Sequence, residues 1–207
     1  MSANVGKQLL PTATSLYVLL GTGWDGEIKA NDGTTIAQLM VLGPEVAMLA
    51  DASSPLFETL SAWRNDNANC FLDTSRVTPQ STRRWLLTLT KSPDRLLFLA
   101  YNNECRPVAQ YGLRRLSADV VELDNGILGV RNEFPDLFFR IQLRILDICK
   151  TRLGFLEVRA RVLADNMPAL FLHKRCGLGK VEILKDQTPD GRDVIVLGAV
   201  LQDINSN

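Results

Sequence analysis

Hydrophobic residues recur along most of the chain at spacings that predict helices and strands in alternation. The clearest helix is expected over residues 136–152, where Phe138, Ile141, Ile145 and Ile148 recur every three or four residues. A glycine at position 154 follows, where helices commonly end. This segment therefore predicts an amphipathic helix with one face packed on the core.

Three shorter helices are predicted from capping residues that stand just before a proline. A serine at 53 or 54 precedes Pro55, and Thr78-Pro79 begins a second helix, because such a cap followed by proline suits the first helical turn. A third helix is expected from Pro168 to Gly177, after a cap at position 165 or 166. The capping residues and prolines thus predict where these three helices begin.

Strands are expected where β-branched and other apolar residues run between turn signals. The order of elements is two helices, three strands, a helix, a strand, a helix and two strands, which predicts a mixed α/β domain with one central sheet over residues 46–207. The expected strands are Leu96–Tyr101, Pro107–Leu113, Val120–Leu128, Phe155–Val162, Val181–Leu184 and Val194–Leu201.

Residues 1–45 form an extension of different composition, rich in glycine and threonine. Its β-prone runs are Leu16–Leu20 and Thr34–Leu42, with a turn signal at Asn31-Asp32-Gly33. We expect a hairpin there. A β-rich extension with exposed edges could pair with a second subunit as a homodimer, or cover a site on the main domain.

Composition then excludes several classes of protein. The 207 residues carry 23 Lys+Arg and 23 Asp+Glu, and this balance argues against a nucleic-acid partner. No apolar run suggests a membrane span, and four scattered cysteines favour reduced thiols in a cytoplasmic protein. The single histidine, His173, rules out a His-rich zinc site, and no metal site is predicted.

Three segments carry a resemblance to a known family. The sequence from Asn166 to Leu178, NMPALFLHKRCGL, resembles the N-x-x-A-x-x-L-(Y or H)-x-K-x-G-F pattern of the GNAT superfamily of acyl-CoA-dependent N-acyltransferases. Upstream, Trp63-Arg64-Asn65-Asp66 and Thr78-Pro79 resemble a branch that acts on nucleotide-linked amino sugars or on ribosomal-protein N-termini. The resemblance covers roughly residues 45–201 and implies a GNAT-like central mixed sheet flanked by helices.

The resemblance implies an enzyme that moves an acetyl or short acyl group from acyl-CoA to a primary amine by direct attack. The expected acceptor is a small molecule, with a nucleotide-linked amino sugar as the leading candidate. Two alternatives stay open, a protein N-terminal acetyltransferase and a non-catalytic acyl-CoA-binding protein. The second is kept open because the loop from Gly129 to Asp136 has fewer small residues than the family's (Q or R)-x-x-G-x-(G or A) pattern.

The implied cofactor site combines that loop with the helix after it. A loop that runs into a helix N-terminus can hold a pyrophosphate through backbone N–H groups. By the resemblance, the backbone around Leu128 to Val130 holds the acyl carbonyl and Asn166 contacts the pantetheine arm, although Asn166 could equally be a helix cap. The implied cofactor residues are Leu128, Gly129, Val130, Arg131, Asn132, Phe134, Asn166 and Ala169.

The implied catalytic group is His173, which stands at the family's tyrosine position beside the leaving sulfur; a helix-surface histidine is the alternative. Glu122 and Asp124 lie two residues apart on one strand, hence on one face, and either could take the amine proton. Asp124 is preferred, although both could be ordinary sheet carboxylates. Arg64 and Asn65 are expected to meet acceptor phosphates, since arginine forks suit phosphate oxygens.

Overall fold

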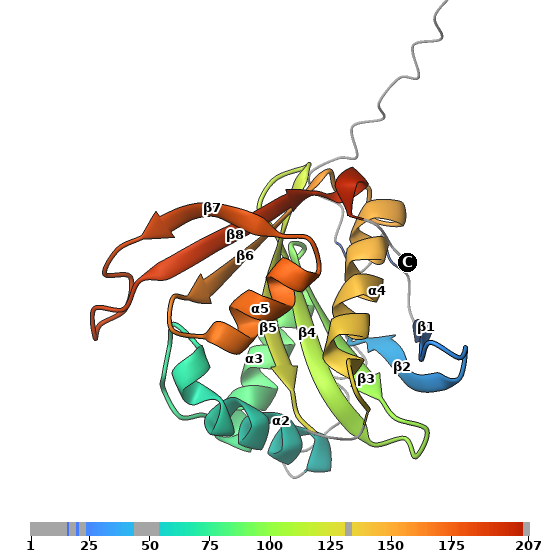
Figure 1. Cartoon of the computed structure of the whole chain (residues 1–207). Coiled ribbons are helices and arrows are strands. Elements are labelled where there is room, and N and C mark those ends of the chain that lie inside the picture. The colour runs from blue at the N-terminus through green and yellow to red at the C-terminus, as the bar shows by residue number, and fades with distance from the viewer. Residues whose placement is uncertain (1–15, 17–19, 21–23, 44–53, 131–133, 205–207) are drawn as a thin grey trace, which may run out of the picture.

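Eight strands form one sheet in the order β1-β2-β3-β4-β5-β6-β8-β7 (Figure 1). Neighbouring strands are antiparallel except for β5 and β6, which are parallel. The computed structural model describes residues 16, 20, 24–43, 54–130 and 134–204. The strands are β1 Trp24–Lys29, β2 Thr35–Val41, β3 Arg95–Tyr101, β4 Pro107–Arg115, β5 Val120–Leu128, β6 Glu157–Leu163, β7 Gly179–Leu184 and β8 Val194–Val200.

The helices begin where their caps predicted. They are α2 Pro55–Asp66, α3 Pro79–Lys91, α4 Leu137–Thr151 and α5 Met167–Arg175, with short 3-10 turns η2 Ala68–Cys70 and η3 Leu201–Asp203. Thr78 and Ser81 form a reciprocal capping box at the start of α3, in which each side chain accepts from the other residue's backbone N–H. The mixed α/β fold class is therefore confirmed.

The helices cover the two faces of the sheet as separate pairs. Along β3, Leu96 and Phe98 pack with α4 and α5, whereas Leu97 and Leu99 pack with α2 and α3. The alternation of side chains along a strand explains this division. The molecule thus has two apolar layers, one on each side of the sheet.

The N-terminal hairpin belongs to the same sheet. Ala30 and Gly33 close the turn predicted at 31–33, and β2 pairs with β3 over Gln38–Val41. The run at 16–20 is different, because Leu16 and Leu20 are helical and not extended as predicted. Both side chains are buried in the apolar layer that contains α4 and α5, so tertiary packing overrides the local β propensity.

Several other features of the described residues bear on what the protein can do. No helix among them is both long and apolar enough to cross a membrane. Nor do His, Cys, Asp and Glu side chains in those ranges gather in groups that could hold a metal. All four cysteines are free; Cys149 and Cys176 are buried, and burial raises the pKa of both thiols.

Candidate active site

The two parallel strands separate partway along their length. The ladder between them joins Val120–Leu123 of β5 to Glu157–Ala160 of β6. From Asp124 onward β5 is bonded to β4, while β6 continues with β8 from Arg161 onward. A wedge therefore opens between β5 and β6 toward their carboxyl ends.

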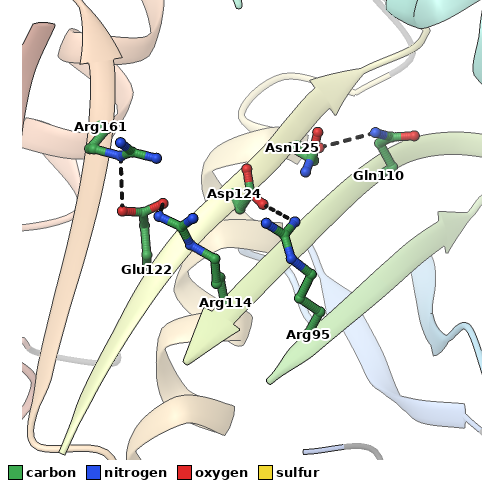
Figure 2. Close-up of polar contacts among 7 residues, drawn as sticks. All are labelled: Arg95, Gln110, Arg114, Glu122, Asp124, Asn125 and Arg161. Atoms are coloured by element: carbon green, nitrogen blue, oxygen red, sulfur yellow. Dashed lines mark hydrogen bonds and ion pairs between the residues drawn. The ribbon is translucent and has the colours of Figure 1, made fainter. Parts of the chain in front are cut away.

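A β-bulge in β5 accompanies this separation. Asn125 has a φ of 49° in the left-handed region, and the register against β4 shifts between Gln110 and Gly112. The Gln110 amide donates to the Asn125 carbonyl at 3.2 Å (Figure 2). Gly112 is required because a Cβ there would lie 2.7 Å from the Asp124 carbonyl oxygen. The extra residue bends the strand and shifts its alternation by one, so that Ile127 returns to the Asp124 face.

A cavity of about 1290 Å³ occupies the wedge. Its walls come from α2 and α3 on one face of the sheet and from α4 and α5 on the other, so the cavity passes through the sheet. Single small-molecule sites commonly measure about 300–1,000 Å³. The space is therefore large enough for two ligands that meet at the gap between β5 and β6.

One face of α5 lines the cavity. Asn166, Ala169 and His173 all lie on it, as their spacing of three and four residues predicts. The Asn166 side-chain oxygen accepts the Ala169 backbone N–H at 3.3 Å, so this residue is a helix cap. Its contact with a cofactor stays a prediction, and its amide nitrogen is not used by the cap.

His173 is an interior residue and not a surface one. Its side chain is 8% exposed, and its Nδ1 has no hydrogen-bond partner within the part of the chain that the structure describes. Burial lowers the pKa of His173 to about 4, because the charged ring loses solvation. The ring is therefore neutral at pH 7 and offers one N–H donor and one acceptor.

The backbone N–H groups at the end of β5, which were predicted to contact the acyl carbonyl, point in two different directions. The N–H groups of Gly129 and Val130 both donate to the Val108 carbonyl, at 2.9 and 3.1 Å, so these two donors are used within the fold. A contact of either residue with a cofactor stays a prediction. Because N–H groups alternate along a strand, the N–H of Leu128 is directed to the other side, toward the gap. Leu128 and Phe134 line the cavity; Arg131 and Asn132 lie outside the described residues.

The carboxylate at the start of α4 is paired with an arginine of α5. Asp136 has a left-handed φ of 63° at the N-cap position but makes no side-chain cap hydrogen bond. Its carboxylate instead accepts from Arg175 at 2.5 Å, and this bond lowers the pKa of Asp136. Arg175 also lies 3.9 Å above the Phe139 ring. The acidic residue that replaces a small one in the loop is thus paired with a cation.

The two carboxylates of β5 do share one face, as predicted, and both line the cavity. Figure 2 shows that each is held by arginine. Glu122 binds Arg114 at 2.8 Å through one oxygen and Arg161 at 3.1 Å through the other, and Asp124 binds Arg95 at 3.0 Å. Sequence reasoning missed Arg95 and Arg161 as partners, although Arg95 begins an otherwise apolar strand and Arg161 occupies a polar position in an alternating one.

Arg64 lines the cavity from α2. One terminal nitrogen donates to the Asp73 carbonyl, and the guanidinium lies 3.9 Å above the Phe71 ring. The other, Nη1, is buried and has no partner among the described residues. Burial lowers the pKa of Arg64. The side chain is therefore placed to meet a ligand in the cavity.

The two neighbours of Arg64 in the sequence, Trp63 and Asn65, contact other parts of the fold. The Asn65 amide donates to the Val77 carbonyl at 2.9 Å and accepts the Val77 N–H at 2.8 Å, which fixes the connection between α2 and α3. Trp63 packs so close to β5 that a Cβ on Gly129 would lie 1.8 Å from its ring. Asn65 does not line the cavity as described, and a contact with substrate stays a prediction.

Comparison with known proteins identifies the fold. No protein-family model matches the chain, and no curated protein matches it in sequence. Among solved structures, a probable GNAT-family acetyltransferase from Chromobacterium violaceum has a TM-score of 0.67 at 14% identity, over 98% of both chains. Spermidine N-acetyltransferase from Vibrio cholerae, in complex with CoA and spermine, has a TM-score of 0.64 at 14% identity, over 80% of this chain and 96% of that one. FdhC, a nucleotide-linked sugar GNAT, has a TM-score of 0.63 at 16% identity, over 86% and 91%.

Proposed function

We propose that this protein, whose fold is that of the GNAT N-acetyltransferases, transfers an acetyl or short acyl group from acyl-CoA to a primary amine of a small molecule. The observation that carries the proposal is the cavity that passes through the sheet where β5 and β6 separate. Such a cavity lets two substrates approach one another from opposite faces. A backbone N–H and a buried imidazole are available at their meeting point.

The described residues fit an acyl-CoA on the α4 and α5 side. The His173 Nδ1 is a buried polar atom that lacks a partner in those ranges, as expected for a group that contacts a ligand. The N-terminus of α4 provides the positive end of a 15-residue helix beside the cavity. Asn166 and Ala169 would flank the pantetheine arm, and Arg175 offsets the charge of Asp136 near the phosphates.

An acyl-CoA supplies a thioester, so that transfer to an amine forms a C–N bond, breaks the C–S bond and releases CoA as a thiolate, which takes a proton from water to become the thiol. The Leu128 N–H is the donor for the acyl carbonyl oxygen. Because His173 is neutral at pH 7, it acts by donating a hydrogen bond to the departing sulfur and not as an imidazolium acid.

For the proton that leaves the amine, Asp124 is the better acceptor of the two β5 carboxylates. Both oxygens of Glu122 are engaged by guanidinium groups, whereas Asp124 uses one oxygen for Arg95. Glu122 is therefore assigned to positioning Arg114 and Arg161. Asp124 takes the proton directly or through water.

A small acceptor is favoured over a peptide because the β7–β8 loop is tied to η2, whose Cys70 lines the cavity. Arg192 donates to the Asn69 carbonyl at 2.8 Å and pairs with Asp190 at 3.0 Å and Asp165 at 3.7 Å. These contacts tie the β7–β8 loop to η2. A nucleotide-linked amino sugar remains the leading candidate, supported by the cavity volume and by the aromatic wall of Trp85 and Phe71.

The test measures cofactor binding and turnover separately. Purified protein should bind CoA in a titration calorimeter and release thiol from acetyl-CoA when amines are added. His173→Phe should lower kcat at least tenfold with little change in acetyl-CoA affinity, because one hydrogen bond to the leaving group is lost. Lys174→Gln, at the neighbouring exposed position, is the matched control. Absence of CoA binding by the folded protein would refute the proposal.

A further inference from the structure

The carboxylates of β5 on the acceptor side of the cavity are matched by arginines. On the sheet face that α2 and α3 cover, three guanidinium groups pair with the two carboxylates of β5, and one of the three, Arg161, lines the cavity. Arg64 on α2 adds another cation, opposite the exposed carboxylate of Asp73. The Asp73 carboxylate is itself occupied, since it accepts the Ser75 backbone N–H at 2.9 Å. Each carboxylate on this side therefore already has a partner within the fold.

Two of these arginines have donors to spare. Arg161 binds Glu122 through Nε, and Figure 2 shows its terminal nitrogens reaching from β6 across toward β5. Its side chain is 39% exposed and lines the cavity. Arg64 has the buried Nη1 that lacks a partner among the described residues. A buried donor without an acceptor is destabilising, and an anionic ligand would supply the missing acceptor.

We propose that the acceptor carries a carboxylate or phosphate in addition to its amine, and that Arg161 and Arg64 form the subsite that binds this anion. The inference rests on the proposed function and narrows its substrate class. Guanidinium forks bind both kinds of anion in a planar, two-pronged geometry. The amine end then lies near Asp124, the one β5 carboxylate with an oxygen left over.

The same charges disfavour a polyamine. A polycation needs carboxylates that are not already neutralised, but Glu122 is 5% exposed and bound on both oxygens. Removing an arginine from such a buried carboxylate would leave a buried charge uncompensated, which is strongly destabilising. The site thus differs in kind from one suited to spermine, which the Vibrio cholerae structure contains.

The test compares pairs of amines in which only one member carries an anionic group. With acetyl-CoA, the full chain should use glucosamine 6-phosphate at least tenfold better than glucosamine, or glycine at least tenfold better than glycinamide, as judged by kcat/KM from thiol release. The sugar pair tests phosphate and the glycine pair tests carboxylate. Spermidine should be used less well than the favoured anion. Equal use of both members in both pairs, or a preference for spermidine, would overturn the proposal.

Variants locate the subsite. Arg161→Gln should remove at least tenfold of the preference for the anionic amine while CoA affinity stays unchanged, and Arg64→Gln should reduce it as well. Arg159→Gln is the matched control, because Arg159 lies on the same strand and face but pairs with Glu157 outside the cavity. A preference that survives in Arg161→Gln and Arg64→Gln contradicts the assignment.

Binding measurements distinguish a failure of this inference from a failure of the proposed function. Calorimetry of the CoA-loaded protein with each pair of amines requires no turnover. Tighter binding of an anionic member, lost in Arg161→Gln, would support the subsite even if no thiol were released, and the acyl-transfer proposal would then be the one to fail. Binding of neither anionic amine by folded, CoA-loaded protein would refute the subsite itself.

Discussion

Lowering the pH from 7.5 to 5 is expected to destabilise the protein through its one histidine. In the unfolded chain His173 takes up a proton near its usual pKa of about 6.5, whereas burial holds the pKa of the folded ring at about 4. Between these values the unfolded state binds more protons than the folded state, so the free energy of unfolding falls as the pH falls.

The size of the effect follows from the two pKa values. One pH unit inside the window is worth about 1.4 kcal/mol, so the histidine contributes a loss of about 2 kcal/mol at pH 5. Its contribution is fully present above pH 6.5 and is lost progressively toward pH 4. Aspartates and glutamates also contribute to the pH dependence of the free energy of unfolding, and the wild type and the variants share this contribution.

Urea unfolding at the two pH values measures the loss. The wild type should lose about 2 kcal/mol more than His173→Phe, in which no group titrates at this position. Lys174→His serves as the matched control, because an exposed histidine has nearly the same pKa in both states and should add no pH dependence. If His173→Phe and the wild type showed the same pH dependence, the imidazole would not be buried as described.

Three further predictions test the packing and the charges. Gly129→Ala should cost about 1–3 kcal/mol of unfolding free energy by overpacking against Trp63, and Trp63→Leu should relieve part of that cost in urea melts of the double variant. Asp136→Gly should leave Tm nearly unchanged, because relief of backbone strain offsets the lost exposed pair with Arg175, while calorimetry shows tighter CoA binding. Glu122→Gln should cost about 3 kcal/mol in urea unfolding, because its two arginines lose their carboxylate.

Local signals predicted the elements of this protein well. Each of α2, α3 and α5 begins at a cap followed by proline, and such caps act within one helical turn. The face that carries Asn166, Ala169 and His173 follows from helical spacing alone. Features set within a few residues could therefore be predicted.

Contacts between distant strands could not be predicted in the same way. Arg95 meets Asp124 and Arg161 meets Glu122 only because of strand order and register, which a single sequence does not specify. The burial of His173 likewise depends on what packs over α5. The bulge did leave a signal, since Asn125-Gly126 interrupts the alternation of polar and apolar residues along β5, and glycine inside a strand often marks a bulge.

That bulge explains why one strand can serve both the core and the site. Before Asn125, the face of β5 toward α2 and α3 carries Glu122 and Asp124, and after it the same face carries Ile127 in the apolar layer. Without the extra residue, strict alternation would direct Ile127 to the opposite face. The bend also accompanies the loss of pairing with β6, so the charged positions come to border open space. A single backbone irregularity therefore sets both the opening of the cavity and the polarity of its wall.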